Sequence, residues 1–285
     1  MAGLRKLTLA LAIVATLADS ALAETPPDAE RRRTLAAPAP DGTNRLLPVS
    51  LQRPPGRGPF PLVVINHGSP PSKERPKMAM PTFSSASNWF LAKGYAVALP
   101  LRRGYGAVGG TWDEGYGPCG KPDFHNAGIE TARDMEASLK KVLEEADIAK
   151  RGVLIVGQSA GGWGTLALST RPHPAVVGLI NFAGGRGGHR NSKAGENCSP
   201  DSLVRAAGEF GRSAKIPMLW IYTENDSYFS PDLARSMHKA FTGNGGKAQL
   251  HMLPPFEEDG HRLLGRRSGV PAWEPLVAPF IATLR

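Results

Sequence analysis

Short, uninterrupted runs of apolar residues recur along the chain, separated by segments with a helical spacing of apolar positions. Strands buried on both faces of a parallel sheet have this composition, because neither face of the strand meets water. The pattern therefore predicts buried strands in six places, at residues 62–66, 95–99, 153–156, 176–182, 217–222 and 248–253.

Between these runs, apolar residues step by three and four positions. From Thr131 to Ala146 they fall on one side of a helix, and charged residues take the other side. Strands that alternate with helices predict a single doubly wound α/β domain with a mostly parallel sheet. We place this domain at residues 45–285, after a segment at 24–44 that is rich in proline, alanine and charge and is predicted to be irregular. Shorter helices are predicted at residues 87–93, 160–169 and 272–284.

Residues 1–23 have the features of a secretory signal peptide. Arg5 and Lys6 make a basic start, an apolar run extends to Leu17, and Ala21-Leu22-Ala23 is a small-x-small cleavage site. A membrane anchor is the alternative, but the apolar run is about half of the roughly 20 residues that a bilayer requires. We therefore expect an exported protein, periplasmic or secreted, with no stable membrane anchor after cleavage.

Composition excludes several classes of protein. The chain has 285 residues, 41% hydrophobic and 21% charged, which is typical of globular domains and excludes wholesale disorder. Its 33 glycines and 26 prolines follow no period, which excludes a collagen-like fibre. The net charge is +9, but the basic residues are dispersed, and the tight cluster Arg31-Arg32-Arg33 has no interleaved aromatic residues. We therefore predict no nucleic-acid partner.

The two cysteines, Cys119 and Cys198, are too few for a disulfide scaffold and do not form the CxxC pair of a zinc ribbon. In the oxidising compartment that export implies, they are either joined by a disulfide or remain as two free thiols. The histidines show neither HxxxH nor HxH spacing, so no metal site is predicted. We expect no cofactor.

A nucleophile elbow is the clearest chemical signal in the chain. The sequence GQSAG at residues 157–161 lies between a predicted buried strand and a predicted helix. The sharp turn of an elbow needs its glycines because β-carbons there would collide with the neighbouring backbone. Ser159 Oγ would then lie at the carboxyl edge of the sheet, and the Ala160 N–H, at a helix N-terminus, would stabilise an oxyanion. The alternative is a glycine-rich turn with an incidental serine.

A serine nucleophile needs a base and a carboxylate, which in this architecture follow in the order Ser, acid, His. Asp226 comes after the predicted strand at 217–222, and His261 comes after the last predicted strand. Glu224 lies closer to the strand end and is the alternative acid, whereas Asp259 is too near His261 in sequence to be its obvious partner. The sequence therefore predicts a triad of Ser159, Asp226 and His261.

The loop after the first buried strand is expected to supply a second oxyanion donor, the N–H of Ser69, with His67 orienting the loop. In the glycine-rich loop at residues 102–116, Tyr105 is either a supplementary donor or a packing residue. Several aromatic residues lie on loops or near the predicted triad, and core packing is the alternative for some of them. They are candidates for the substrate pocket: Tyr105, Trp112, Trp163 and Tyr228.

With these residues in place, the chain resembles α/β-hydrolases of the dienelactone-hydrolase and prolyl-oligopeptidase-like branch. The resemblance covers about residues 45–285, and it implies an eight-stranded, mostly parallel sheet and hydrolysis of ester, thioester or peptide bonds. Only short insertions are predicted on the catalytic edge, chiefly residues 184–215 with Cys198, so we expect a small cap and a fairly open site. Dienelactone hydrolases proper carry a cysteine where this chain has Ser159, which argues against dienelactone as the substrate. Prolyl oligopeptidases carry a large propeller, and only about 20 to 40 residues precede the first core strand here. The matching positions are His67-Gly68, Arg103-Gly104-Tyr105-Gly106, Gly157 to Gly162, Asp226 and Asp259-Gly260-His261.

The sequence thus favours an exported serine hydrolase that cleaves a small-molecule carboxylic ester through an acyl-enzyme. An aminopeptidase or dipeptidase with the same triad is one alternative, although no clear pair of glutamates lies near the site loops to hold a substrate amine. A non-catalytic binding protein on the same fold is the other. The sequence makes no prediction of oligomeric state.

Overall fold

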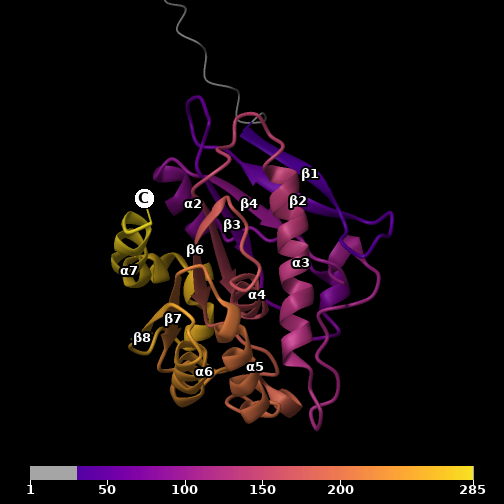
Figure 1. Cartoon of the computed structure of the whole chain (residues 1–285), viewed down its shortest axis with the longest axis vertical. Coiled ribbons are helices and arrows are strands. Elements are labelled where there is room, and N and C mark those ends of the chain that lie inside the picture. Colours follow the sequence, from indigo (N-terminus) through magenta and orange to yellow (C-terminus); the bar gives the residue numbers. More distant parts are fainter. Residues whose placement is uncertain (1–30, 285) are drawn as a thin grey trace, which may run out of the picture.

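The computed structural model describes residues 31–284, so the predicted signal peptide lies outside the described residues. One eight-stranded sheet runs through the molecule in the order β1-β2-β4-β3-β5-β6-β7-β8 (Figure 1). β1 pairs antiparallel with β2 and β2 antiparallel with β4, and the other pairs are parallel. The strands are β1 (Arg32–Pro38), β2 (Leu46–Gln52), β3 (Leu62–Asn66), β4 (Ala96–Pro100), β5 (Val153–Gln158), β6 (Val176–Phe182), β7 (Met218–Thr223) and β8 (Ala248–Leu253).

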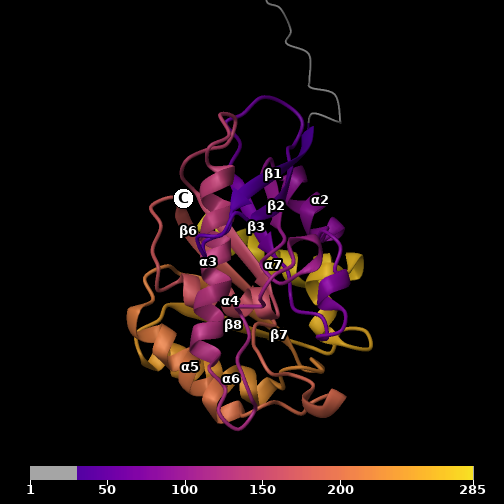
Figure 2. The ribbon, with the colours of Figure 1, turned by 90° about the vertical axis from the view of Figure 1, so that its right-hand side faces the viewer.

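Helices cover both faces of the sheet, and each face has its own hydrophobic core. Figure 2 shows α3 and α5 on one side of the sheet and α2 and α7 on the other. Continuous apolar strands such as β3, in which all five residues are buried, form because both faces are covered. The helices are α2 (Ser84–Ala92), α3 (Phe124–Val142), α4 (Ala160–Leu168), α5 (Pro200–Ser213), α6 (Pro231–Gly243) and α7 (Val270–Ala282).

The predicted α/β-hydrolase architecture, with its mostly parallel sheet, is confirmed. The segment at 24–44, predicted to be irregular, instead contains β1, whose Leu35 and Ala37 are buried while Arg33 faces outward. This strand forms because β2 offers an edge with which it pairs along its whole length.

The segment at 184–215, predicted to be an insertion on the catalytic edge, contains α5. Leu203, Ala207 and Phe210 of α5 are buried in the same core as α3 and α6, so this helix belongs to the covering layer. Only the loop between β6 and α5 remains at the edge of the sheet. Among residues 31–284, no helix is both long enough and apolar enough to cross a membrane.

Candidate active site

Ser159 lies in the sharp turn between β5 and α4. Its backbone has φ 56° and ψ −120°, a conformation that non-glycine residues rarely adopt. The turn is tight enough that a β-carbon on Gly157 would lie 2.2 Å from the carbonyl oxygen of Gly161, and one on Gly161 would lie 2.4 Å from the oxygen of Asn66. The glycines predicted for the elbow are therefore needed for the close approach of β5, α4 and β3.

His261 and Asp226 meet at the carboxyl edge of the sheet. His261 Nδ1 lies 3.0 Å and 3.1 Å from the two carboxylate oxygens of Asp226. The backbone N–H groups of Tyr228 and Phe229 donate to Asp226 Oδ1 at 2.8 Å and 3.0 Å, and so fix the carboxylate in place. Since a carboxylate accepts, Nδ1 carries the proton and Nε2 keeps a free lone pair that can accept a proton.

Glu224 and Asp259, two other acidic residues near the ends of β7 and β8, do not pair with the imidazole of His261. Glu224 is exposed to solvent. Asp259 accepts from the His261 N–H at 3.0 Å and from the Ser227 hydroxyl at 2.8 Å, and so joins the loop after β8 to the loop after β7. Burial alone raises the pKa of Asp259, but the hydrogen bonds from His261 and Ser227 lower it overall. Asp226 is therefore the carboxylate that faces the imidazole.

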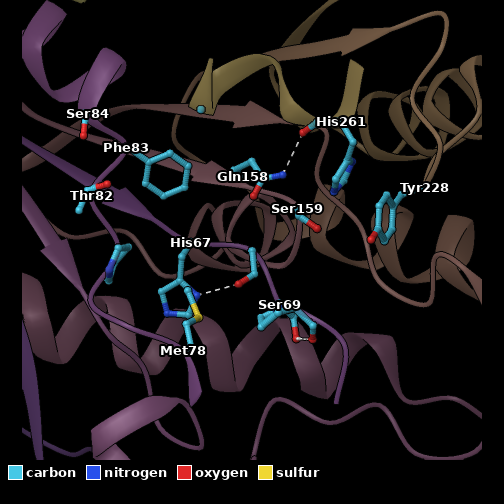
Figure 3. A pocket seen from close by; sticks show the side chains of 14 residues that line it. His67, Ser69, Met78, Thr82, Phe83, Ser84, Gln158, Ser159, Tyr228 and His261 are labelled. Atoms are coloured by element: carbon cyan, nitrogen blue, oxygen red, sulfur yellow. Dashed lines mark hydrogen bonds between the residues drawn. The ribbon is translucent and has the colours of Figure 1, made fainter. Parts of the chain in front are cut away.

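Ser159 and His261 line the same cavity, of about 490 Å³ (Figure 3). Within residues 31–284, the hydrogen bonds of His261 go to Asp226, Asp259 and Gln158, and none reaches Ser159 Oγ. Bonds between a serine nucleophile and its base are commonly loose without substrate and tighten when it binds. His261 therefore lines the cavity with Ser159, and its Nε2 has no hydrogen-bond partner among the described residues.

The loop after β3 passes directly beside the nucleophile. A β-carbon on Gly68 would lie 2.8 Å from Ser159 Cβ, so only glycine lets the loop come this close. The next residue, Ser69, lines the cavity with Ser159. Ala160 is the first residue of α4, so its N–H has no acceptor within the helix. Both residues predicted to supply oxyanion donors are thus near Ser159, since Ala160 follows it in the chain and Ser69 lines the same cavity.

His67 fixes the shape of this loop. It is buried, its Nδ1 lies 2.7 Å from the carbonyl of Gly68, and its Nε2 accepts from the Arg102 N–H at 3.3 Å. Burial and the nearby Arg102 cation lower the pKa of His67 to about 3. The imidazole is therefore neutral and serves as a structural donor and acceptor.

A second cavity, of about 410 Å³, is also lined by Ser159. The two cavities share Ser69, Pro70, Ser159 and Tyr228. The first cavity has His261, Phe83 and Met78 among its lining residues. The second is lined by Ala160 and by aromatic and basic side chains, which include Arg75, Trp112, Tyr116, Arg186 and His189.

Trp112 and Tyr228, both candidates for the substrate pocket, line these cavities, but Tyr105 and Trp163 do not. Tyr105 is fully buried, its hydroxyl accepts from Trp112 Nε1 at 3.1 Å, and burial together with the negative charge of Glu114 raises its pKa. Trp163 faces the core from α4, where its Nε1 donates to the carbonyl of Phe124 at 2.8 Å. The structure thus places Tyr105 under the cavity wall and Trp163 in the core.

Cys119 and Cys198 form a disulfide, with an S–S distance of 2.02 Å across 79 positions of sequence. It joins the loop after β4, which carries Trp112, to the loop after β6, which carries Arg186. The two walls of the second cavity are therefore covalently linked.

The sequence analysis did not identify Arg75, Arg186 or Phe83 as site residues. Gln158, which could have been found as a neighbour of Ser159 in the elbow, donates to the His261 carbonyl at 3.1 Å. For the part of the chain that is described, no group of three or more histidine, cysteine, aspartate or glutamate side chains is placed to hold a metal ion.

Comparison with known proteins places this geometry in a wider context. Residues 80–269 match the model of the dienelactone hydrolase family. No curated protein sequence matches the chain. Among solved structures, an esterase from Pyrococcus furiosus superposes with a TM-score of 0.62 at 15% identity, covering 89% of this chain and 92% of the esterase.

Larger peptidases share the fold over part of their length. The Pyrococcus horikoshii acylaminoacyl peptidase has a TM-score of 0.63 at 15% identity, and the match covers 87% of this chain and 41% of the peptidase. The Porphyromonas gingivalis dipeptidyl peptidase 4 has a TM-score of 0.63 at 14% identity, with 89% and 35% covered. At 14–15% sequence identity, these structural similarities establish the fold alone. The chain spans less than half the length of either peptidase.

Proposed function

We propose, from the premise that the chain belongs to the dienelactone hydrolase family, that it is a serine hydrolase that cleaves carboxylic esters. The observation that carries the proposal is the meeting of Ser159, on its strained turn, with the Asp226-held imidazole of His261 in one cavity. We assign the N–H groups of Ala160, the first residue of α4, and of Ser69, which lines the same cavity as Ser159, as the donors to the tetrahedral oxyanion. Together these groups supply the nucleophile, the base and the electrostatic stabilisation that acyl transfer requires.

The reaction proceeds in two halves. His261 Nε2 takes the proton of Ser159 as Oγ attacks the ester carbonyl, and the two N–H groups hold the resulting oxyanion. The imidazolium, stabilised by Asp226, then gives its proton to the departing alkoxide and leaves an acyl-enzyme. Water, deprotonated by His261, attacks the acyl-enzyme, and collapse of the second tetrahedral intermediate releases the acid and restores Ser159.

The charge of the two cavities supports an ester over a peptide with a free amino terminus. An aminopeptidase holds the substrate ammonium group with carboxylates. No aspartate or glutamate is among the described residues that line either cavity beside Ser159, and the second cavity is lined by two arginines. A cationic lining repels an ammonium group.

The test is hydrolysis of short and medium p-nitrophenyl esters by the protein without residues 1–23, beside Ser159→Ala, with fluorophosphonate labelling of both. We expect turnover and labelling in the first protein and the loss of both in the variant. A folded protein that neither labels nor turns over any ester would contradict the proposal and would favour a binding protein on the same fold.

We also propose that the chain is exported and that the mature protein begins at Glu24. The support is the basic and apolar leader, together with the Cys119–Cys198 disulfide, since such bonds persist in oxidising compartments. Mass spectrometry of the protein from the periplasm or culture medium should find Glu24 at the amino terminus. Full-length protein retained in the cytoplasm would refute export.

A further inference from the structure

The second cavity beside Ser159 has an unusual lining for a site that is to receive an apolar acyl chain. Arg75 comes from the short turn Arg75–Lys77, Trp112 from the loop after β4, and Arg186 from the loop after β6. Three separate segments therefore converge on one space of about 410 Å³. Two of them contribute a guanidinium group.

Arg75 has no carboxylate partner among the residues described. Its guanidinium lies over the indole ring of Trp112, with Cζ 3.4 Å from a ring centroid. The side chain is half-buried, and this burial lowers the pKa of Arg75. Partial burial of a guanidinium without an anionic partner is unfavourable, because the cation loses hydration and gains no ion pair. Binding of an anion beside Arg75 would offset this penalty.

Arg186 is still more buried, with 3% of its surface exposed. Its Nη2 donates to Glu114 and, at 2.6 Å, to Thr131 Oγ1, but its Nε is buried with no hydrogen-bond partner. Cζ of Arg186 lies 5.9 Å from the centroid of Trp112. Trp112 thus contacts both guanidinium groups, and each has unused donor capacity.

The charges around this cavity do not balance. Glu114 is shared by two buried arginines, because Arg102 Nη2 also donates to it at 3.2 Å. Asp113, which precedes Glu114 in the sequence, forms an ion pair with Arg103, with 2.8 Å between Oδ2 and Nη1. Arg102 and Arg186 therefore share the one carboxylate of Glu114, Arg75 has no ion-pair partner among the described residues, and the wall of the second cavity carries an excess of positive charge.

The position of His261 indicates which part of a substrate would occupy this space. His261 gives its proton to the leaving alkoxide, and it lines the first cavity but not the second. The leaving group therefore departs through the first cavity. The second, whose lining includes the oxyanion donor Ala160, receives the acyl group.

We propose that the second cavity binds a carboxylate carried by the acyl part of the substrate, so that the enzyme acts on half-esters of dicarboxylic acids. Arg75 supplies a planar pair of donors that matches a carboxylate, and Arg186 Nε and the positive wall strengthen the attraction. This inference rests on the proposed ester hydrolysis. It assigns the acyl specificity to Arg75, Arg186 and Trp112.

The test compares the monoethyl esters of succinic, glutaric and adipic acids with ethyl butyrate, ethyl pentanoate and ethyl hexanoate, which have the same acyl lengths. Proton release is followed at constant pH. We expect kcat/KM to favour at least one half-ester over its neutral partner by about tenfold or more, as expected for a charge-assisted pair. Equal or better hydrolysis of every neutral ester would overturn the carboxylate site while leaving ester hydrolysis intact.

Arg75→Gln removes the charge and keeps much of the side-chain volume. We expect the ratio of kcat/KM values, half-ester to neutral ester, to fall about tenfold in this variant. Lys77→Gln is the matched control, since Lys77 is an exposed cation in the same turn and lines neither cavity. An equal fall of the ratio in both variants would mean general electrostatic attraction and would overturn the site.

Binding can be measured without catalysis. In Ser159→Ala, calorimetry should detect the adipate, glutarate or succinate dianion but not the neutral hexanamide, and adding Arg75→Gln should weaken binding of the dianion about tenfold. This result would stand even if no ester were hydrolysed, which separates failure of the site from failure of the proposed function. Absence of dicarboxylate binding, or binding that Arg75→Gln does not change, would overturn the proposal.

Discussion

The ring of Tyr228 stacks on the imidazole of His261, with 4.1 Å between ring centroids and 26° between planes. Its other neighbour is His189, stacked at 3.6 Å, so the phenol ring lies between two imidazoles. Asp226 fixes one nitrogen of His261, but hydrogen bonds at one edge leave the ring free to tilt. The packed face of Tyr228 restricts this tilt and keeps Nε2 directed into the cavity.

Tyr228→Leu should lower kcat by up to about tenfold, in keeping with the roughly 0.5–1.5 kcal/mol that an aromatic pair contributes. Tyr228→Phe retains the stacked ring and should stay within about twofold of the parent enzyme. Steady-state kinetics on a p-nitrophenyl ester measures both. If the phenylalanine variant were as slow as the leucine variant, the hydroxyl would be the important group instead of the ring.

Asp226→Asn should lower kcat by about three to four orders of magnitude, because the amide no longer stabilises the imidazolium or selects the tautomer with a proton on Nδ1. Glu224→Gln is the control, since Glu224 is exposed and was the alternative acid in the sequence. It should change kcat less than twofold. A large fall in kcat for Glu224→Gln with little change for Asp226→Asn would make Glu224 the acid of the triad instead.

Replacing both cysteines, Cys119→Ser with Cys198→Ser, should lower the free energy of unfolding by about 4 kcal/mol, because the bond closes a long loop in the unfolded chain. Urea unfolding with and without reductant measures the loss. The reductant should destabilise the parent protein and leave the double variant unchanged. Since the bond joins two walls of the second cavity, KM should also rise for substrates whose acyl group occupies it.

His67 makes stability depend on pH. Its pKa is about 3 in the folded protein, below the ordinary value of about 6.5, so the unfolded chain binds a proton that the folded one does not. The stabilising contribution is complete above pH 6.5 and is lost as the pH falls from 6.5 towards 3, at about 1 kcal/mol for each pH unit. His67→Asn, which cannot titrate, should lack this loss.

Asp134 has the opposite effect on how stability depends on pH, so the measurement must distinguish its contribution from that of His67. Burial is the main cause that raises its pKa to about 6, so its protonation favours the folded state as the pH falls below 6. The measurement is therefore the difference in unfolding free energy between the parent and His67→Asn, taken at pH 7.5, 6 and 5. This difference should shrink as the pH falls, and a constant difference would contradict the assignment to His67.

Local patterns were sufficient to predict most of the sheet and the elbow. The strands of the parallel core were recognisable because burial on both faces leaves continuous apolar runs, and Ser159 because its turn requires glycines at fixed positions. β1 was missed because two buried residues, Leu35 and Ala37, in a proline-rich segment give almost no periodic signal. The pairing that stabilises β1 is with residues of β2, which local pattern does not reveal.

The walls of the cavities could not be predicted in the same way. In sequence, Arg75 lies near Lys73 and Lys77 and resembles a solvated basic stretch, and its lack of an acidic partner is a fact of the folded chain. Trp163 follows Ser159 by four positions, which suggested a pocket residue. On α4 it turns instead to the core, where it packs against Phe210.

The two cavities share Ser69, Pro70, Ser159 and Tyr228, and beyond these four they are lined by different residues. Residues 78–84 contribute to the wall of the first cavity, and residues 71–75 together with the loops after β4 and β6 form the wall of the second. Changes in one set of segments can therefore accumulate without altering the opposite cavity. Preference for the alcohol and preference for the acid are separable traits in this architecture, and relatives that differ in one of them are expected to differ in one set of loops.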